Sequence, residues 1–192
     1  MLDDLIQTPQ PATKADTARL AELIVIAGDG LPLVAWQSMQ VGSESLMDIG
    51  TARASRDTGG FSFRNADVVR VAGEVVSALV SYPITEETSA KDMEVVPNLF
   101  KPLVALENLA VPSWYINVLA TDERARCKGA GTMLLAHAEA KARASGYDRV
   151  SLITGDINPA RRLYEKLGFR IQARDRIEKK GGTMTVSIGC FM

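Results

Sequence analysis

The first third of the chain carries apolar residues at helical spacing. Within residues 13–27 they recur every three or four positions, which predicts an amphipathic helix ended by Gly28. Thr13 and Asp16 precede this run and are its candidate N-caps. A second short helix is expected over residues 31–39, because proline is tolerated in a first helical turn and Pro32 stands there. Residues 43–55 predict a third helix.

The pattern then becomes extended. Residues 66–71 and 74–82 are rich in valine and are joined by Ala72-Gly73, which predicts two antiparallel strands and a compact turn. Residues 83–112 contain four prolines and few clear periods, apart from a short helix expected around residues 99–108. We therefore expect a long, irregular connection there.

The last third alternates between the two patterns. Strands are expected over residues 114–120, 149–154, 169–173 and 183–191, and helices over residues 131–144 and 159–167. Gly181-Gly182 predicts a turn between the last two strands. Together these elements predict a mixed α+β layer.

Composition narrows the class of protein. The chain has 192 residues, of which 46% are hydrophobic, and this fits one globular domain over residues 1–192. Its net charge of -1 comes from 22 basic and 23 acidic side chains, so we expect no nucleic-acid or anionic-membrane partner. Cys127 and Cys190 lie far apart without histidine at zinc spacing, which argues against a metal site or a disulfide framework.

Targeting signals are not expected either. The start of the sequence lacks a basic opening followed by an apolar stretch, and no run of about twenty apolar residues could span a bilayer. A reducing cytoplasm is the predicted compartment.

The most informative segment is Arg126-Cys127-Lys128-Gly129-Ala130-Gly131, which joins a predicted strand to a predicted helix. Its glycines allow close approach of a ligand, and the helix start offers unpaired N–H groups and a positive dipole end, which suit a pyrophosphate. Arg124 adds positive charge beside Arg126 and Lys128. A plain strand-to-helix turn is the alternative. The dinucleotide fingerprint is excluded, because Leu134 stands where its third glycine belongs, and the Gly-Lys-Ser/Thr of the phosphate loop is absent.

A second motif covers residues 158–169. It predicts a helix in which Asn158 is the cap, Pro159 stands in the first turn, Leu163 and Leu167 are buried, and a left-handed Gly168 ends the helix. Packing gives no reason for Tyr164.

Taken in this order, the two motifs resemble the GNAT superfamily of N-acetyltransferases, over residues 114–169. The family pattern of Gln or Arg, two residues, Gly, one residue, and Gly or Ala matches Arg126, Gly129 and Gly131. The helical pattern matches Asn158, Ala160, Leu163, Tyr164, Gly168 and Phe169.

The resemblance implies a GNAT fold, with a central mixed and mostly antiparallel twisted sheet of six to seven strands, flanked by helices and splayed where CoA binds. It implies acetyl-CoA as cosubstrate, without a metal. The implied contact residues are Leu119, Thr121, Arg124, Arg126, Cys127, Lys128, Gly129, Ala130, Gly131, Thr132, Asn158, Arg161 and Tyr164.

The mechanism that the resemblance implies is direct attack of an amine on the thioester, with Tyr164 protonating the departing thiolate. Some relatives carry a glutamate base at the strand position of Tyr115, and Asn117 on the same face is no carboxylate either. Glu107 is the nearest upstream carboxylate and is our candidate base, with a solvated loop charge as the alternative. Four aromatic residues are candidates for an acceptor pocket, with core packing as the favoured alternative for each: Trp36, Phe61, Phe63 and Trp114.

The predicted function is therefore transfer of an acetyl group from acetyl-CoA to an amine on a small molecule or a protein. A catalytically weak or inactive CoA-binding module is the alternative, because the strand glutamate is missing. A purely structural or interaction domain is a third reading. A homodimer stays open.

Overall fold

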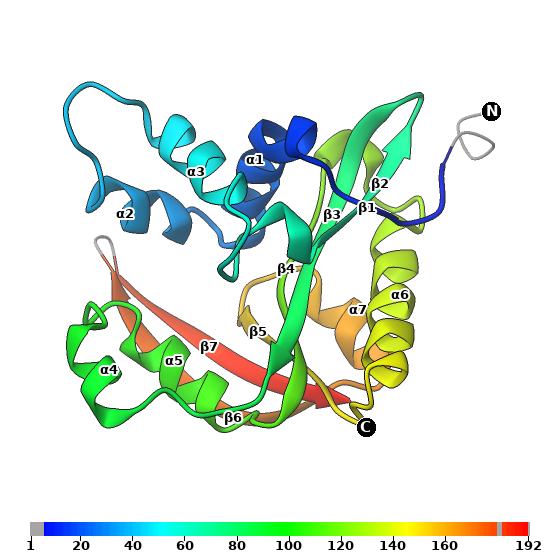
Figure 1. Ribbon diagram of the computed structural model, residues 1–192. Coiled ribbons are helices and arrows are strands. Elements are labelled where there is room, and N and C mark those ends of the chain that lie inside the picture. The colour runs from blue at the N-terminus through cyan, green and yellow to red at the C-terminus, as the bar shows by residue number, and fades with distance from the viewer. Residues whose placement is uncertain (1–5, 180–181, 192) are drawn as a thin grey trace. The chain divides into compact units, whose positions relative to one another are not determined.

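The structure is a computed structural model that describes residues 6–179 and 182–191 (Figure 1). Its helices are α1 Thr17–Ala27, α2 Leu31–Gln37, α3 Leu46–Ala54, α4 Ala90–Val95, α5 Lys101–Asn108, α6 Ala130–Ala144 and α7 Arg161–Lys166. Its strands are β1 Gln10–Pro11, β2 Ala66–Val71, β3 Glu74–Ile84, β4 Ser113–Thr121, β5 Val150–Gly155, β6 Arg170–Lys179 and β7 Gly182–Phe191.

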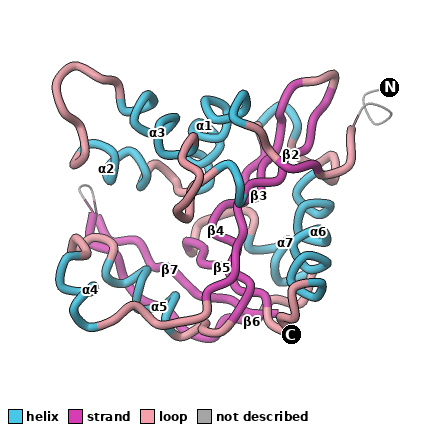
Figure 2. Tube along the Cα trace, viewed as in Figure 1, coloured by secondary structure: helices cyan, strands magenta, loops and turns pink. Residues whose placement is uncertain are grey.

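The strands belong to one mixed seven-stranded sheet in the order β1-β2-β3-β4-β5-β7-β6 (Figure 2). The β1–β2, β2–β3, β5–β7 and β6–β7 pairs are antiparallel, whereas β4 and β5 are parallel. The parallel ladder covers three residue pairs, from Trp114 opposite Val150 to Ile116 opposite Leu152. The predicted fold class, a mostly antiparallel mixed sheet with flanking helices, is confirmed.

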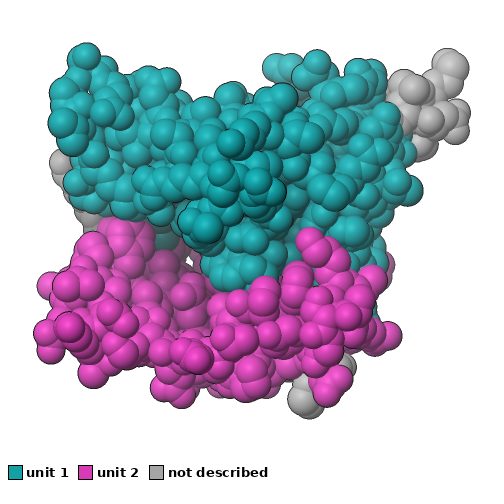
Figure 3. Space-filling view, in the orientation of Figure 1, with its two compact units in different colours: residues 1–82, 117–139 teal, residues 83–116, 140–192 magenta. Residues whose placement is uncertain are grey.

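The chain divides into two compact units, which Figure 3 colours separately. Unit 1 consists of Met1–Tyr82 and Asn117–Glu139, and unit 2 of Pro83–Ile116 and Ala140–Met192. In the described part of the chain, no helix has both the length and the apolar character needed to cross a bilayer.

The core of unit 1 forms around the apolar face of α1. Leu20, Leu23 and Ile24 are at most 2% exposed and belong to one cluster with Trp36 of α2 and Val68 of β2. Burying a side chain of this size stabilises a fold by about 1.5–3 kcal/mol. The predicted amphipathic helix is therefore confirmed.

The start of that helix differs in detail from the prediction. Residues 14–16 form a 3-10 turn, and α1 begins at Thr17. Thr13 and Asp16 form a capping box around this turn, in which the Thr13 amide donates to the Asp16 carboxylate at 2.8 Å. The same carboxylate pairs with Arg70 of β2 at 2.8 Å, so Asp16 also ties the helix start to the sheet.

The hairpin between β2 and β3 has the predicted compact turn. Ala72 and Gly73 both have positive φ, at 50° and 86°. Two successive positive φ values are the mark of a turn that matches the twist of the flanking strands. β3 continues two residues past the expected end, to Ile84.

The expected long irregular connection in unit 2 is wrong over residues 90–95, which form a helix. α5 lies where the short helix was expected, and α4 was not predicted. Ser89 caps α4 by accepting a hydrogen bond from the Asp92 amide at 3.1 Å. None of the side chains of α4 is buried, so no apolar period marks it in the sequence.

The last two strands are antiparallel partners. β6 extends to Lys179, beyond the expected end at residue 173. β7 begins at Gly182 and pairs along β6, with Asp175 opposite Val186. The predicted Gly181-Gly182 turn lies partly outside the described residues.

Candidate active site

The loop that follows β4 is anchored at Asp122 in unit 1. The Asp122 amide donates to the Val76 carbonyl of β3 at 2.8 Å. Its carboxylate accepts the Arg124 amide at 2.9 Å and pairs with the guanidinium of Arg19 on α1. The hydrogen bond from the Arg124 amide and the contact with Arg19 hold the pKa of the Asp122 carboxyl below its ordinary value, so this anchor stays charged at neutral pH.

The end of β4 is fixed from its other neighbour as well. The buried Ser77 hydroxyl of β3 donates to the Ala120 carbonyl at 2.7 Å and lies 2.8 Å from the Thr121 hydroxyl. Val118 and Ala120 are buried, whereas Leu119 and Thr121 alternate with them and are half-buried. Leu119 and Thr121 therefore share the less buried face of β4.

The predicted phosphate loop has a special backbone. Cys127 has φ of 62° and Gly129 has φ of 87°, which are left-handed values. Such a value costs a side chain with a Cβ about 1–2 kcal/mol. The backbone is therefore strained at Cys127. At position 129 the residue is glycine, which has no Cβ and adopts this conformation without strain.

The loop ends at the N-terminus of α6, one residue earlier than expected. The Met133 amide donates to the Gly129 carbonyl at 2.9 Å, so Gly129 precedes the first helical residue, Ala130. The amides of Ala130, Gly131 and Thr132 then have no helical carbonyl behind them. Three N–H groups and the positive end of the helix dipole meet at this loop, which is the geometry of an anion site.

The same loop carries three basic side chains. Arg126 Nε donates to the Thr121 carbonyl at 3.4 Å, and Lys128 Nζ donates to the Arg124 carbonyl at 3.2 Å. Arg124, Arg126 and the thiol of Cys127 are exposed. The predicted loop residues thus form one basic, accessible segment of unit 1.

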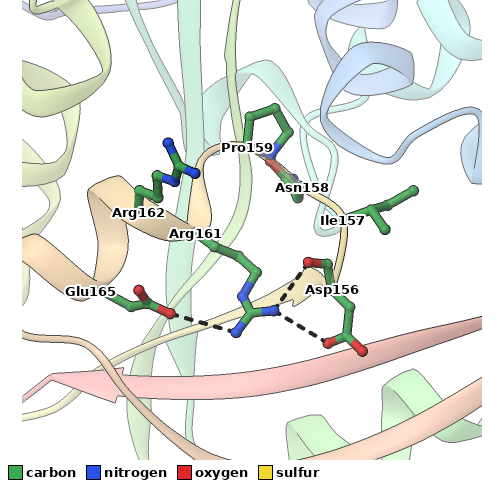
Figure 4. A pocket seen from close by; sticks show the side chains of 7 residues that line it. All are labelled: Asp156, Ile157, Asn158, Pro159, Arg161, Arg162 and Glu165. Atoms are coloured by element: carbon green, nitrogen blue, oxygen red, sulfur yellow. Dashed lines mark hydrogen bonds and ion pairs between the residues drawn. The ribbon is translucent and has the colours of Figure 1, made fainter.

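The second predicted motif lies in unit 2 and borders a pocket of about 490 Å³ (Figure 4). The expected cap is wrong by two residues, because α7 begins at Arg161 and Ala160 is its N-cap. The Asn158 side-chain oxygen instead accepts a hydrogen bond from the Ala160 amide at 2.9 Å. The backbone carbonyl of Asn158 accepts one from the Arg161 amide at 3.1 Å. Pro159 therefore belongs to this turn and not to the helix.

Arg161 links the turn before α7 to the helix itself. Its guanidinium donates to the Asp156 carbonyl at 3.0 Å and lies 3.5 Å from the Glu165 carboxylate, as Figure 4 shows. It also lies 3.7 Å from the Asp156 carboxylate. The side chain is thereby held along the pocket that Asn158 borders.

Tyr164 is the buried residue of α7, with 7% exposure. Leu163 and Leu167 were expected to be buried and are half-buried, because this six-residue helix turns Tyr164 inward. The phenol ring meets Phe169 edge-on, with centroids 6.0 Å apart. Burial raises the pKa of Tyr164 to about 12, so the hydroxyl is neutral at physiological pH.

The predicted end of the helix at Gly168 is confirmed. Its φ is 95°, and a Cβ there would lie 3.1 Å from the Phe191 ring. A left-handed value and this close ring both favour glycine.

Glu107 lies at the end of α5 and is half-buried. Burial raises the pKa of its carboxyl, and a side-chain hydrogen bond with Tyr115 of β4 partly offsets that rise. Tyr115, which the family resemblance matches to the glutamate of some relatives, is thus bonded to the candidate base. The sequence reasoning named both residues and missed their pairing.

The predicted site residues therefore fall into two groups. Unit 1 holds those of the strand end and the loop: Leu119, Thr121, Arg124, Arg126, Cys127, Lys128, Gly129, Ala130, Gly131 and Thr132. Unit 2 holds Glu107, Asn158, Arg161 and Tyr164. Over residues 6–179 and 182–191, no group of three or more His, Cys, Asp and Glu side chains has the arrangement of a metal site.

The mixed sheet, the loop before α6 and the motif around α7 define the class of protein as an acetyltransferase fold. The family model described as the acetyltransferase (GNAT) family matches residues 40–169. Because this match covers more than half of the chain, the protein belongs to the GNAT acetyltransferase family, as the two motifs predicted. Members of this family use acetyl-CoA as cosubstrate.

Solved structures agree with this fold. A structure described as the apo form of a mutant agmatine N-acetyltransferase has 18% identity and a TM-score of 0.70, covering 98% of this chain and 99% of that one. The polyamine N-acetyltransferase of Drosophila melanogaster has 17% identity and a TM-score of 0.69, with 97% and 99% covered. A structure described as an acetyltransferase has 24% identity and a TM-score of 0.63, with 95% and 98% covered. No curated protein matches the sequence.

Proposed function

We propose that the protein transfers the acetyl group of acetyl-CoA to a primary amine by direct attack in a ternary complex. The observation that carries this proposal is the loop from Arg126 to Gly131, where left-handed residues lead into the free amides of α6. Such amides suit the pyrophosphate of CoA. The acceptor is an amine on a small molecule or a protein.

The cofactor contacts follow from that loop. The amides of residues 127–132 bind the pyrophosphate, and Arg124, Arg126 and Lys128 add charge around it. The backbone of Leu119 and Thr121 pairs with the pantetheine as an added strand would. Asn158 and Arg161 of unit 2 remain predicted cofactor contacts on the strength of the family resemblance.

The chemistry needs two proton transfers. The amine nitrogen bonds to the thioester carbon, the carbon–sulfur bond breaks, and Tyr164 supplies a proton to the thiolate. Glu107 takes the proton that the amine loses, directly or through water. A lysine-like amine with a pKa near 10.4 costs about 4.6 kcal/mol to deprotonate at pH 7, so a base matters most for alkyl amines.

Two structures similar in fold carry names of polyamine and agmatine acetyltransferases. Small alkyl amines are therefore the first acceptors to test. The single-domain organisation with a CoA-binding core over residues 114–169, the cytoplasmic location and the homodimer remain predictions.

Binding and turnover are tested in sequence. Acetyl-CoA at about 100 times its Kd should stabilise the fold by about 2.7 kcal/mol, which for this size raises Tm by roughly 5–11 °C. ATP and NAD should not. Lys128→Gln should reduce the shift, whereas Lys91→Gln, an exposed lysine of α4, should not. Equal shifts with ATP would contradict the CoA site.

Release of free thiol from acetyl-CoA with a panel of amines then tests transfer. Turnover with at least one primary amine is expected. Stabilisation by acetyl-CoA without thiol release for any amine would favour the alternative, a catalytically weak or inactive CoA-binding module. If acetyl-CoA neither stabilises the protein nor releases thiol, the remaining alternative is a structural or interaction domain.

A further inference from the structure

Arg53, in the last turn of α3, is a partly buried cation without an acidic partner among the described residues. Its Nε is inaccessible and has no hydrogen-bond acceptor. Its Nη1 contacts the Met39 sulfur at 3.3 Å, and a thioether is a weak acceptor. The guanidinium lies over the Phe61 ring, 5.8 Å from its centroid. Burial and the neighbouring Arg56 lower the pKa of Arg53, which shows that its surroundings disfavour the charge.

The acids closest in sequence are already used. Asp48 belongs to the capping box of α3 and accepts the Ser45 hydroxyl at 2.7 Å. Asp57, the one acid within residues 53–64, pairs with Arg64 at 2.7 Å. The C-terminal end of a helix favours a cation by about 0.3–1 kcal/mol, which accounts for the sign of the charge. It supplies no acceptor for Nε, and a buried donor without a partner is costly.

Arg53 is linked to β4 by a series of contacts within unit 1. Phe61 follows Gly60, where a Cβ would lie 2.7 Å from the Tyr82 hydroxyl, so this loop packs directly on Tyr82. The Tyr82 hydroxyl accepts the Asn117 side-chain amide at 3.1 Å. Asn117 shares its face of β4 with Leu119 and Thr121, because alternate strand residues point the same way.

We infer that Arg53, seated on the Phe61 ring, binds a carboxylate of the acceptor, so that the substrate is an amine that also carries an acid group, such as an amino acid or a peptide. This inference rests on the proposed function. Arginine binds a carboxylate through two parallel donors. The Nε–H of Arg53 has no acceptor but is covered in this structure, so it joins such a pair only when the side chains over it move aside. Met39, which is 44% exposed and flexible, is the group that the carboxylate displaces. A polycation would meet uncompensated positive charge here.

Matched substrate pairs test this inference. Arginine with agmatine and phenylalanine with phenethylamine differ only by the carboxylate beside the reacting amine. In the wild-type protein, kcat/KM from thiol release should be about 10- to 100-fold higher for the carboxylated member, the size of a charge-assisted hydrogen-bond pair. Arg53→Met should abolish this preference and leave the decarboxylated amines unchanged.

The variants are chosen to separate binding from folding. Methionine keeps an apolar stem at position 53 without leaving a buried charge, and Tm with acetyl-CoA checks its fold. Arg56→Met removes an exposed charge one turn away and should keep the preference. Equal rates for both members of each pair in the wild type, or an equal loss for both in Arg53→Met, would overturn the inference alone. If no amine releases thiol, the proposed function fails first and this inference with it.

Discussion

Removing the hydroxyl of Tyr164 gives the sharpest test of the proposed chemistry. The ring is 7% exposed and packs against Phe169, and phenylalanine keeps that packing. Within the described residues, the hydroxyl has no hydrogen-bond partner that the change would strand. Tyr164→Phe should therefore change the free energy of unfolding by no more than about 0.5 kcal/mol.

The effect on turnover follows from the pKa of about 12. A thiol leaving group has a pKa near 8.5, so complete proton transfer from this phenol to the thiolate is uphill by about 5 kcal/mol. The proton is therefore only partly transferred in the transition state, where the hydroxyl stabilises the departing thiolate chiefly as a hydrogen-bond donor. A hydrogen bond to a charged group contributes about 1.5–3 kcal/mol, so Tyr164→Phe should lower kcat about 10- to 150-fold.

The assay is thiol release at pH 7 with saturating acetyl-CoA and the best amine of the panel. Tyr147→Phe is the matched control, because Tyr147 packs edge-on against Trp114 in the same unit and should not affect kcat. Unchanged turnover in Tyr164→Phe would remove the assigned role. A loss above about 10⁴-fold would exceed what acid catalysis supplies and would refute the argument from its pKa.

Two further predictions concern the base and the core. Because the pKa of Glu107 is raised and a base acts when ionised, kcat/KM should fall on acidification at a higher pH than it would for an ordinary carboxyl. Tyr115→Phe removes the offsetting hydrogen bond and should shift that fall to still higher pH. A pH profile unchanged in this variant would contradict the pairing of Glu107 with Tyr115. Gly50→Ala should destabilise α3, because its Cβ would lie 2.4–2.9 Å from three indole atoms of Trp36 and overpacking of about 1–3 kcal/mol outweighs a helix gain of about 1 kcal/mol. Urea unfolding measures this loss, and Trp36→Phe in the same background should reduce it.

The fold was predictable where burial leaves a period in the sequence. α1 shows its apolar face in Leu20 and Leu23, and the β2–β3 hairpin shows valine runs around Ala72-Gly73. β1 and α4 leave no such period, because the two residues of β1 are exposed and α4 has no buried side chain. The end of β6 was missed for the same reason, since residues 174–176 are charged and exposed while pairing with β7.

The site was predictable where chemistry lies in adjacent residues. The loop at Gly129 has a left-handed backbone just before a helix, and the spacing of its glycines predicts this conformation from neighbouring residues alone. The turn at Asn158 depends on which of two capping geometries the chain adopts, and both fit the same residues. The lack of an acid beside Arg53 could not be predicted, because it depends on partners that Asp48 and Asp57 find elsewhere in unit 1.

The case for an inactive CoA-binding module depended on the tyrosine that replaces a strand glutamate. In the structure, Tyr115 is hydrogen-bonded to Glu107, so the end of α5 brings a carboxylate to the same strand residue. Burial raises the pKa of that carboxyl toward the operating pH, which is the direction that makes a carboxylate a better proton acceptor for an amine. The Glu107–Tyr115 pair therefore supports our proposal of Glu107 as the base, which the pH profile of Tyr115→Phe tests.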